Sequence, residues 1–260
     1  MTKSQFRSKL GENIFRLKYA QGPEDSWDAC AERIIDDVCG TRSGTTQALM
    51  SEENRERLVK AIKEFKFLPG GRYIYYAGRP ASFYNNCYLL RAEYDTREEW
   101  GEVAKRATSC LMTGGGIGGD YSILRGKGKV IKRTGGVSSG PISLMHMVNE
   151  IGRNVRQGGS RRSAIYASLN WQHDDIYDFL VAKNWDEGTK ARKEEDFNAV
   201  APLDMTNISV NYDDAWLYKK NRELDDVFLK NCRQAMETGE PGFSFNFGDK
   251  QNETLRNALN

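Results

Sequence analysis

The amino-terminal part of the chain, residues 1–66, repeats apolar side chains at the spacing of amphipathic helices. A first stripe consists of Phe6, Leu10, Ile14 and Leu17. A second, more regular stripe consists of Trp27, Cys30, Ala31, Ile34, Ile35 and Val38 and is followed by Gly40, a helix-stop signal. Ser51 predicts the N-cap of a third helix with an apolar side formed by Leu58, Ile62 and Phe65. We therefore expect a small helical region over 1–66.

Beyond Pro69 the pattern changes to short β-prone runs separated by helical stretches. The predicted strands are Tyr73–Ala77, Cys87–Leu90, Tyr121–Leu124, Ala164–Leu169, Asn207–Val210 and Phe243–Phe247. The predicted helices are Glu98–Met112, Pro141–Val155, Asp174–Ala182 and Glu223–Thr238. This alternation predicts an α/β fold with βαβ units and parallel strand pairing. The charged stretch Asp186–Asp196 is interpreted as a solvated loop.

Composition argues against two classes of protein, those that bind nucleic acid and those that span a membrane. Lys and Arg number 38 and Asp and Glu 36, which gives a formal net charge of +2. This balance argues against a polyanion-binding arm, so no nucleic-acid partner is expected. No apolar run reaches the about 18 residues that a membrane span needs, and the amino terminus lacks the apolar stretch of a signal peptide. We therefore expect a cytoplasmic chain without a membrane partner.

Cysteine and histidine are sparse and widely spaced. The cysteines are Cys30, Cys39, Cys87, Cys110 and Cys232, and the two histidines are His146 and His173. Because there is no CxxC pair and neither histidine has a companion at metal-ligand spacing, a disulfide scaffold and a metal site are not expected. The histidines are interpreted as structural, and a cysteine–histidine nucleophile stays open.

Three glycine-rich segments have both a functional and a structural interpretation. Gly114–Gly119 contains GxGxxG but follows a predicted helix and precedes a predicted strand, the reverse of a dinucleotide fingerprint. Its glycines are interpreted as letting backbone approach a ligand or a neighbouring strand. Arg133–Pro141 opens a helix, where phosphate binding and simple capping are both possible and capping is favoured. Val155–Ser163, with three arginines, either grips an anionic ligand or forms an exposed turn.

Eight segments in a fixed order resemble the catalytic subunit of ribonucleotide reductase. They are FLPGGRYIYYAG, NNCYLL, GGGIGGDYSILRGKGKVI, RTGGVSSGPISLMHMVNEI, VRQGGSRRSAI, WQHDDIYDFLVAK, MTNISVNYD and TGEPGFSFNF. Each segment is weak alone, and their shared order makes the resemblance specific over residues 66–257. The segments look most like the class II enzymes, which use adenosylcobalamin. The class I catalytic subunit, which depends on a di-metal radical subunit, is a close relative and is kept as an alternative.

The resemblance implies a ten-stranded α/β barrel made of two five-stranded parallel halves. Strands beginning at Cys87, Tyr121, Ala164, Asn207 and Phe243 would form one half. We therefore expect a helical region over 1–66, followed over 67–260 by the first barrel half, truncated before the finger-loop cysteine.

The resemblance also implies radical chemistry on the ribose of a nucleotide. The family replaces the 2′-hydroxyl with hydrogen through a thiyl radical, and two further cysteines supply electrons and become a disulfide. Cys87 matches the first of this pair. The implied substrate-binding residues are Gly71, Arg72, Asn86, Cys87, Gly115 and Gly116.

The end of the chain departs from the family's finger-loop motif, Asn-x-Cys-x-Glu. Asn257 matches the asparagine, whereas Leu259 stands at the cysteine position. We therefore expect the product of a split or interrupted gene, or a truncation, that is inactive without a carboxy-terminal reductase fragment. That fragment would carry the radical cysteine and the second electron donor.

Regulatory loops are implied by the same resemblance. The residues predicted to serve a dNTP or ATP effector and its specificity loops are Asp95, Arg125, Lys127, Arg133, Gln157, Ser160, Arg161 and Arg162. Further expected partners are the ribonucleotide substrate, a thioredoxin- or glutaredoxin-type reductant and a second copy in a homodimer. Diphosphate and triphosphate substrates both stay open. A non-catalytic alternative is a nucleotide-binding or interaction module derived from a reductase.

Overall fold

A computed structural model describes residues 6–23, 25–40, 50–132, 135–155 and 163–248. The chain divides into two compact units, Met1–Asn85 and Asn86–Asn260, which are considered separately. The expected division at residue 66 therefore falls inside the first unit. None of the helices within the described ranges is long and apolar enough to cross a membrane.

The first unit is helical. Its elements are α1 (Lys9–Ile14), the π-helical turn η1 (Phe15–Tyr19), α2 (Trp27–Cys39), α3 (Glu52–Lys63) and α4 (Gly71–Tyr76). Side chains of Ser26 and Ser51 cap the starts of α2 and α3, and the Ser51 cap was predicted. The predicted second stripe is confirmed, because its residues form a core around Trp27, whose ring stacks on Phe65 at 4.9 Å.

Two predictions for the first unit are wrong. The first stripe was predicted to be the apolar side of a helix, but Leu10 and Leu17 are 69% and 84% exposed. Phe15 is buried instead, because the π-helical turn breaks the regular helical spacing. The segment Tyr73–Ala77, predicted as a strand, lies in helix α4 and its C-cap. Its aromatic residues favour a strand locally, but burial of Ile74 against the helical core overrides that preference.

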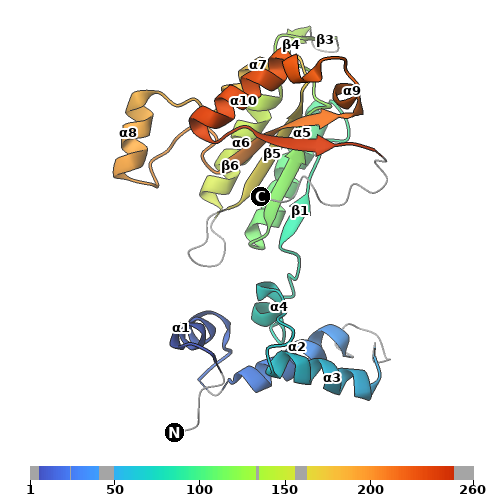
Figure 1. Ribbon diagram of the computed structural model, residues 1–260, viewed down its shortest axis with the longest axis vertical. Coiled ribbons are helices and arrows are strands. Elements are labelled where there is room, and N and C mark those ends of the chain that lie inside the picture. Colours follow the sequence, from blue (N-terminus) through green and yellow to red (C-terminus); the bar gives the residue numbers. More distant parts are fainter. Residues whose placement is uncertain (1–5, 24, 41–49, 133–134, 156–162, 249–260) are drawn as a thin grey trace. The chain divides into compact units, whose positions relative to one another are not determined.

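The second unit is built on a five-stranded sheet in the order β1-β2-β5-β6-β7 (Figure 1). The strands are β1 (Cys87–Leu89), β2 (Gly116–Asp120), β5 (Ile165–Asn170), β6 (Thr206–Asp213) and β7 (Gly242–Asn246). All four neighbouring pairs are parallel, which confirms the predicted α/β class. A separate antiparallel pair joins β3 (Val130–Ile131) and β4 (Gly136–Val137).

Helices connect the parallel strands. They are α5 (Arg97–Met112), α6 (Pro141–Asn154), α7 (Ile176–Leu180), α8 (Glu187–Glu195), α9 (Asp214–Leu217), the 3-10 turn η3 (Arg222–Leu224) and α10 (Asp226–Thr238). The four helices predicted in this region are found within a few residues of their expected bounds. The predicted loop Asp186–Asp196 is wrong, since it holds α8. The Asp186 carboxylate caps this helix by accepting from the Thr189 N–H at 2.7 Å.

The glycine-rich segment forms strand β2 itself, so the strand predicted at Tyr121–Leu124 is wrong. Glycine has a low β-propensity, and the segment is a strand because parallel neighbours hold it on both sides. A Cβ atom at Gly119 would lie 2.8 Å from the Leu90 carbonyl oxygen, and one at Gly115 would overlap the Tyr88 ring. The interpretation that these glycines allow close approach of a neighbouring strand is confirmed.

This crowding predicts opposite effects for two glycine-to-alanine changes. Gly119→Ala should lower the free energy of unfolding by about 1–3 kcal/mol, because backbone must move to accept the methyl group. The control is Gly101→Ala on α5, where an added Cβ meets nothing within 4 Å. This variant should gain about 0.5–1 kcal/mol from better helix propensity. Urea unfolding measures both, and equal effects would contradict the described packing.

Candidate functional site

The two faces of the parallel sheet differ in chemistry. One face is apolar and packs against helices through a buried cluster that includes Ile117, Ile165, Ala167, Leu169, Ile208, Val210 and Tyr212. Because successive side chains of a strand point to opposite faces, the residues between these face away from the helices. We call this second side the polar face, and its members include Cys87, Tyr166, Ser168, Ser209, Asn211, Ser244 and Asn246. No hydrophobic cluster within the described ranges covers it.

Hydrogen bonds link the polar face across four strands. Ser168 Oγ donates to the Gly119 carbonyl at 3.5 Å, and Asn211 Nδ2 donates to Ser168 Oγ at 3.0 Å. Asn246 Nδ2 in turn donates to Asn211 Oδ1 at 3.4 Å and to Ser244 Oγ at 3.2 Å. Ser168 and Asn211 are buried, and such partners offset the cost of removing polar groups from water. The result is a pre-ordered, uncharged row of hydroxyl and amide groups.

Tyr166 is the largest side chain on the polar face. It is 8% exposed and yet belongs to neither hydrophobic cluster. Burial raises its pKa above the usual value, against the opposing effect of hydrogen bonds with Ser209, Ser244 and Ser168. The phenol therefore stays protonated at neutral pH and presents a neutral hydroxyl.

Cys87 begins edge strand β1 on the same face as Tyr166. It is half-buried and pairs in register with Gly116 on β2. The Asn86 carbonyl accepts a hydrogen bond from the Gly116 N–H at 2.8 Å, and Gly115 precedes that strand. The structure thus gathers four of the six predicted substrate-binding residues at the start of β1 and β2.

Comparison with known proteins decides the family. Residues 85–246 match the family model described as "Ribonucleotide reductase, barrel domain". The chain belongs to this family. The matched region covers most of the second compact unit, Asn86–Asn260, and contains the whole parallel sheet.

Similar proteins are reductases. The "Vitamin B12-dependent ribonucleoside-diphosphate reductase" of Mycobacterium tuberculosis (strain CDC 1551 / Oshkosh) is 27% identical over 210 residues, 73% of this chain and 28% of that protein. The Thermoplasma acidophilum protein of the same name is 29% identical over 208 residues, 73% of this chain and 25% of that protein. The "Ribonucleoside-diphosphate reductase large subunit" of Plasmodium falciparum (isolate FCR-3 / Gambia) is 29% identical over 144 residues, 55% of this chain and 18% of that protein. The chain thus spans about a quarter of the length of the B12-dependent relatives.

Most of the other site residues predicted for this reductase-family chain lie either in the first unit or outside the described part of the chain. Gly71 and Arg72 begin α4 in the first unit, where Arg72 is buried and its Nη1 donates to the Phe83 carbonyl at 2.9 Å. Their contact with substrate stays a prediction. The predicted residues that lie outside the described part of the chain are Arg133, Gln157, Ser160, Arg161, Arg162 and Asn257.

Two of the predicted effector residues of the reductase fold lie together. Arg125 Nε is 2.5 Å from Asp95 Oδ2, and its Nη2 donates to the Asp95 carbonyl at 3.1 Å. The Lys127 N–H donates to both carboxylate oxygens of Asp175, at 2.9 and 3.0 Å. Asp95 and Arg125 therefore form one polar group that joins the ends of β1 and β2, and their role toward an effector stays a prediction.

Asp175 was not among the predicted site residues. Its carboxylate accepts the Lys127 N–H and so holds the segment that follows β2. Its N–H donates to His173 Nδ1 at 3.0 Å, so the His173 proton is on Nε2, which donates to the Leu124 carbonyl at 2.6 Å. These contacts hold the His173 ring between Leu124 and Asp175, and its structural interpretation stays a prediction. Residues 122–126, Asn170 and residues 172–174 border a concavity of about 490 Å³ at the carboxyl ends of β2 and β5. The sequence signal for this site is the pair Asp174 and Asp175, which follows the end of β5 by four and five residues.

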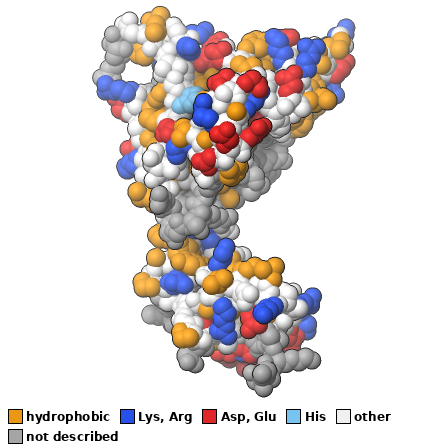
Figure 2. Space-filling view, turned by 90° about the vertical axis from the view of Figure 1, so that its left-hand side faces the viewer, with side chains coloured by type: hydrophobic (Ala, Val, Ile, Leu, Met, Phe, Trp, Pro, Cys, Tyr) orange, Lys and Arg blue, Asp and Glu red, His pale blue; other side chains and the backbone are white. Residues whose placement is uncertain are grey.

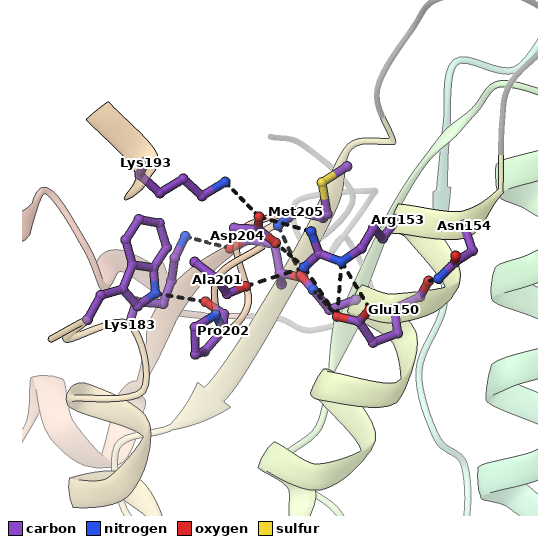
Figure 3. Close-up of polar contacts among 12 residues, drawn as sticks. Glu150, Arg153, Asn154, Lys183, Lys193, Ala201, Pro202, Asp204 and Met205 are labelled. Carbon is purple, nitrogen blue, oxygen red and sulfur yellow. Dashed lines mark hydrogen bonds and ion pairs between the residues drawn. The ribbon is translucent and has the colours of Figure 1, made fainter. Parts of the chain in front are cut away.

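An ionic cluster anchors the opposite end of the reductase sheet (Figure 3). Arg153, in the last turn of α6, binds Asp204 through Nη2 at 2.5 Å and Nη1 at 3.1 Å. Lys193 of α8 contacts the same carboxylate at 2.7 Å. The Asp204 side chain is only 3% exposed. On the face drawn in Figure 2, acidic and basic side chains both occur. The cluster therefore fixes α6 and α8 to the start of β6.

Proposed function

We propose that this chain forms half of the catalytic barrel of a ribonucleotide reductase and that its polar face lines the active site. The supporting observation is the polar face itself. Parallel sheets normally have apolar packing on both faces. Here one face carries hydroxyl, amide and thiol groups, as the interior of a ten-stranded barrel that binds a nucleotide would require. Strands that complete the barrel would come from polypeptide outside these 260 residues, in line with the greater length of the relatives.

In this proposal Cys87 supplies one of two reducing thiols. Replacement of the ribose 2′-hydroxyl by hydrogen releases water and consumes two electrons and two protons. Two thiols provide both when their sulfurs join as a disulfide, at about 2.05 Å. Cys87 is half-buried on the polar face, where a facing strand could bring the second thiol within reach. A thioredoxin- or glutaredoxin-type reductant would restore the two thiols.

We further propose adenosylcobalamin as the cofactor of the complete enzyme, because two of the similar reductases are named B12-dependent. When bound, this cofactor supplies the radical that starts the reaction. Among the described residues no group of three or more His, Cys, Asp or Glu side chains could hold a metal ion. A cofactor that carries its cobalt inside its own ring fits this donor set, since it needs no such cluster. The names of these relatives also favour a ribonucleoside diphosphate as substrate.

Reconstitution tests this function. The chain would be mixed with a polypeptide carrying the remaining barrel strands, together with CDP, a dithiol and adenosylcobalamin. Deoxycytidine diphosphate should form only in the complete, cobalamin-containing mixture. Product formed by this chain alone would refute the half-barrel, and activity that requires a di-metal radical subunit instead of cobalamin would support the class I alternative.

A further inference from the structure

Strand β7 lies at the edge of the parallel sheet and still contributes to the polar face. Within the described ranges it is paired on one side only, by β6. Its half-buried Asn246 donates to Asn211 on β6 at 3.4 Å and to the Ser244 hydroxyl at 3.2 Å. An edge strand has no second neighbour to bind its backbone N–H and C=O groups. The place of Asn246 on the polar face therefore depends on how firmly β7 is attached to β6.

An aspartate extends this attachment beyond the strand pairing. The pairing of β6 with β7 ends at Asp213 and Asn246, because β6 runs directly into helix α9. Asp214 is the first residue of α9. Its two carboxylate oxygens accept from the Gly248 N–H at 3.1 and 3.3 Å, two residues past the end of β7. Gly248 has a φ of +83°, which favours glycine, so the chain turns where the carboxylate holds it.

The helix that carries Asp214 is itself attached to both neighbours of β6. The Asp213 carboxylate accepts from Asn170 Nδ2 at 3.0 Å and from Trp171 Nε1 at 3.1 Å, which joins the end of β6 to the end of β5. On the other side, the buried Trp216 ring of α9 stacks on Phe247 with a centroid distance of 6.3 Å and an interplanar angle of 5°. These contacts fix the helix from which the carboxylate reaches Gly248.

Helix α10 begins with the same pair of residues and uses them differently. Asp225 and Asp226 start α10 as Asp213 and Asp214 start α9, and in both pairs the first carboxylate caps the helix. The second carboxylate of α10, on Asp226, pairs with Lys230 of its own helix at 3.0 Å. An aspartate in a first turn stabilises a helix through the helix dipole without contacting a strand. The bond from Asp214 to a strand end is therefore additional to the usual role of an aspartate at this position.

We propose that Asp214 is a positioning residue for the reductase active site. By accepting from the Gly248 N–H it keeps the end of β7 against β6 and so holds Asn246 in place on the polar face. This inference rests on the proposed function, in which that face lines the active site. The role requires a hydrogen-bond acceptor and not a negative charge, so an asparagine at position 214 can perform it.

The test measures turnover of CDP by the reconstituted reductase. Asp214→Ala removes the acceptor and should lower the turnover number about fivefold, the effect of one typical hydrogen bond. Asp214→Asn keeps an acceptor oxygen and should retain the wild-type turnover number. Asp226→Ala is the matched control, because Asp226 has the same place at the start of α10 and its side chain is 64% exposed. This control should also turn over like the wild type.

Two turnover results would overturn the assignment. Equal losses in Asp214→Ala and Asp214→Asn would show that the charge at the helix start matters and the hydrogen bond does not. Unchanged turnover in Asp214→Ala would show that the attachment has no effect on the active site. If Asp214→Ala does not fold, Asp214→Asn decides alone, because lost turnover in this variant contradicts a role as acceptor.

Amide hydrogen exchange of the wild-type chain alone tests the bond without any assay of activity. The Gly248 N–H should exchange at least about fivefold more slowly than an unstructured amide. Exchange at the unstructured rate would refute the attachment. Failure of the wild-type mixture to reduce CDP would instead refute the proposed function, and with it the role of Asp214 in an active site, whereas slow exchange at Gly248 would still support the attachment itself.

Discussion

Cys87→Ser is expected to reduce multiple-turnover formation of deoxyribonucleotide by the reconstituted enzyme to background. Serine preserves the size of the side chain at the start of β1, so the sheet should be unaffected. A hydroxyl cannot join a second thiol as a disulfide, so the two electrons for the 2′-carbon are no longer available. Formation of the cofactor-derived radical should persist, because that step precedes thiol oxidation. Product assays with a dithiol, together with electron paramagnetic resonance, measure the two steps separately.

Cys110→Ser is the control for this variant. Cys110 is half-buried on α5 and packs against the apolar cluster, away from the polar face. Burial also raises the pKa of its thiol, as expected of a packing residue. Its loss should cost some stability and leave turnover near the wild-type level. Normal multiple turnover by Cys87→Ser would contradict the electron-donor role.

Asp204→Ala is expected to lower the free energy of unfolding by about 3–5 kcal/mol, the usual cost of removing one partner of a buried ion pair. The variant leaves Arg153 without its bidentate partner and removes the contact of Lys193 at 2.7 Å (Figure 3). The control is Glu187→Gln, because Glu187 is 90% exposed in its pair with Lys190 and should change stability by about 0.5 kcal/mol or less. Urea unfolding compares the two, and similar losses would contradict the buried cluster.

The Asp204 carboxylate also makes the stability of the fold depend on pH, and the stability falls as the pH is lowered. Burial opposes ionisation of Asp204, but hydrogen bonds and charges from Arg153 and Lys193 outweigh it and lower the pKa from 3.8 to about 2. Its stabilising contribution is therefore present above about pH 4 and is lost as the pH falls toward 2. We expect a loss of about 2 kcal/mol over this window, and a smaller loss in Asp204→Asn. Identical pH profiles for the two proteins would contradict this assignment.

Local patterns predicted much of the fold. The stripe from Trp27 to Ile35, the serine cap of α3 and the proline at the start of α6 each specify a helix through contacts within one or two turns. Strand β2 was misplaced because its glycines have no intrinsic preference for a strand and are held by β1 and β5, which are distant in sequence.

The candidate site was only partly predictable from the sequence. The alternation in Thr206–Asp213 is visible in the sequence and predicts a two-sided strand, but which side faces a helix depends on the assembled sheet. Tyr166 meets Ser244 only after three strands align in register. Asp204 likewise contacts Arg153 across 51 positions. Contacts of this range leave no local signal, so the resemblance located Cys87 but did not predict these contacts.

The most direct measurement of the central claim is a single turnover without external reductant. The reconstituted enzyme would be given CDP and adenosylcobalamin, and its disulfides would then be mapped by mass spectrometry. Because the cysteines are free before the reaction, any new disulfide reports the electrons consumed. We predict about one deoxyribonucleotide per active site and a disulfide that joins Cys87 to a cysteine of the complementing polypeptide. Product formation that leaves the thiol of Cys87 free would contradict the account.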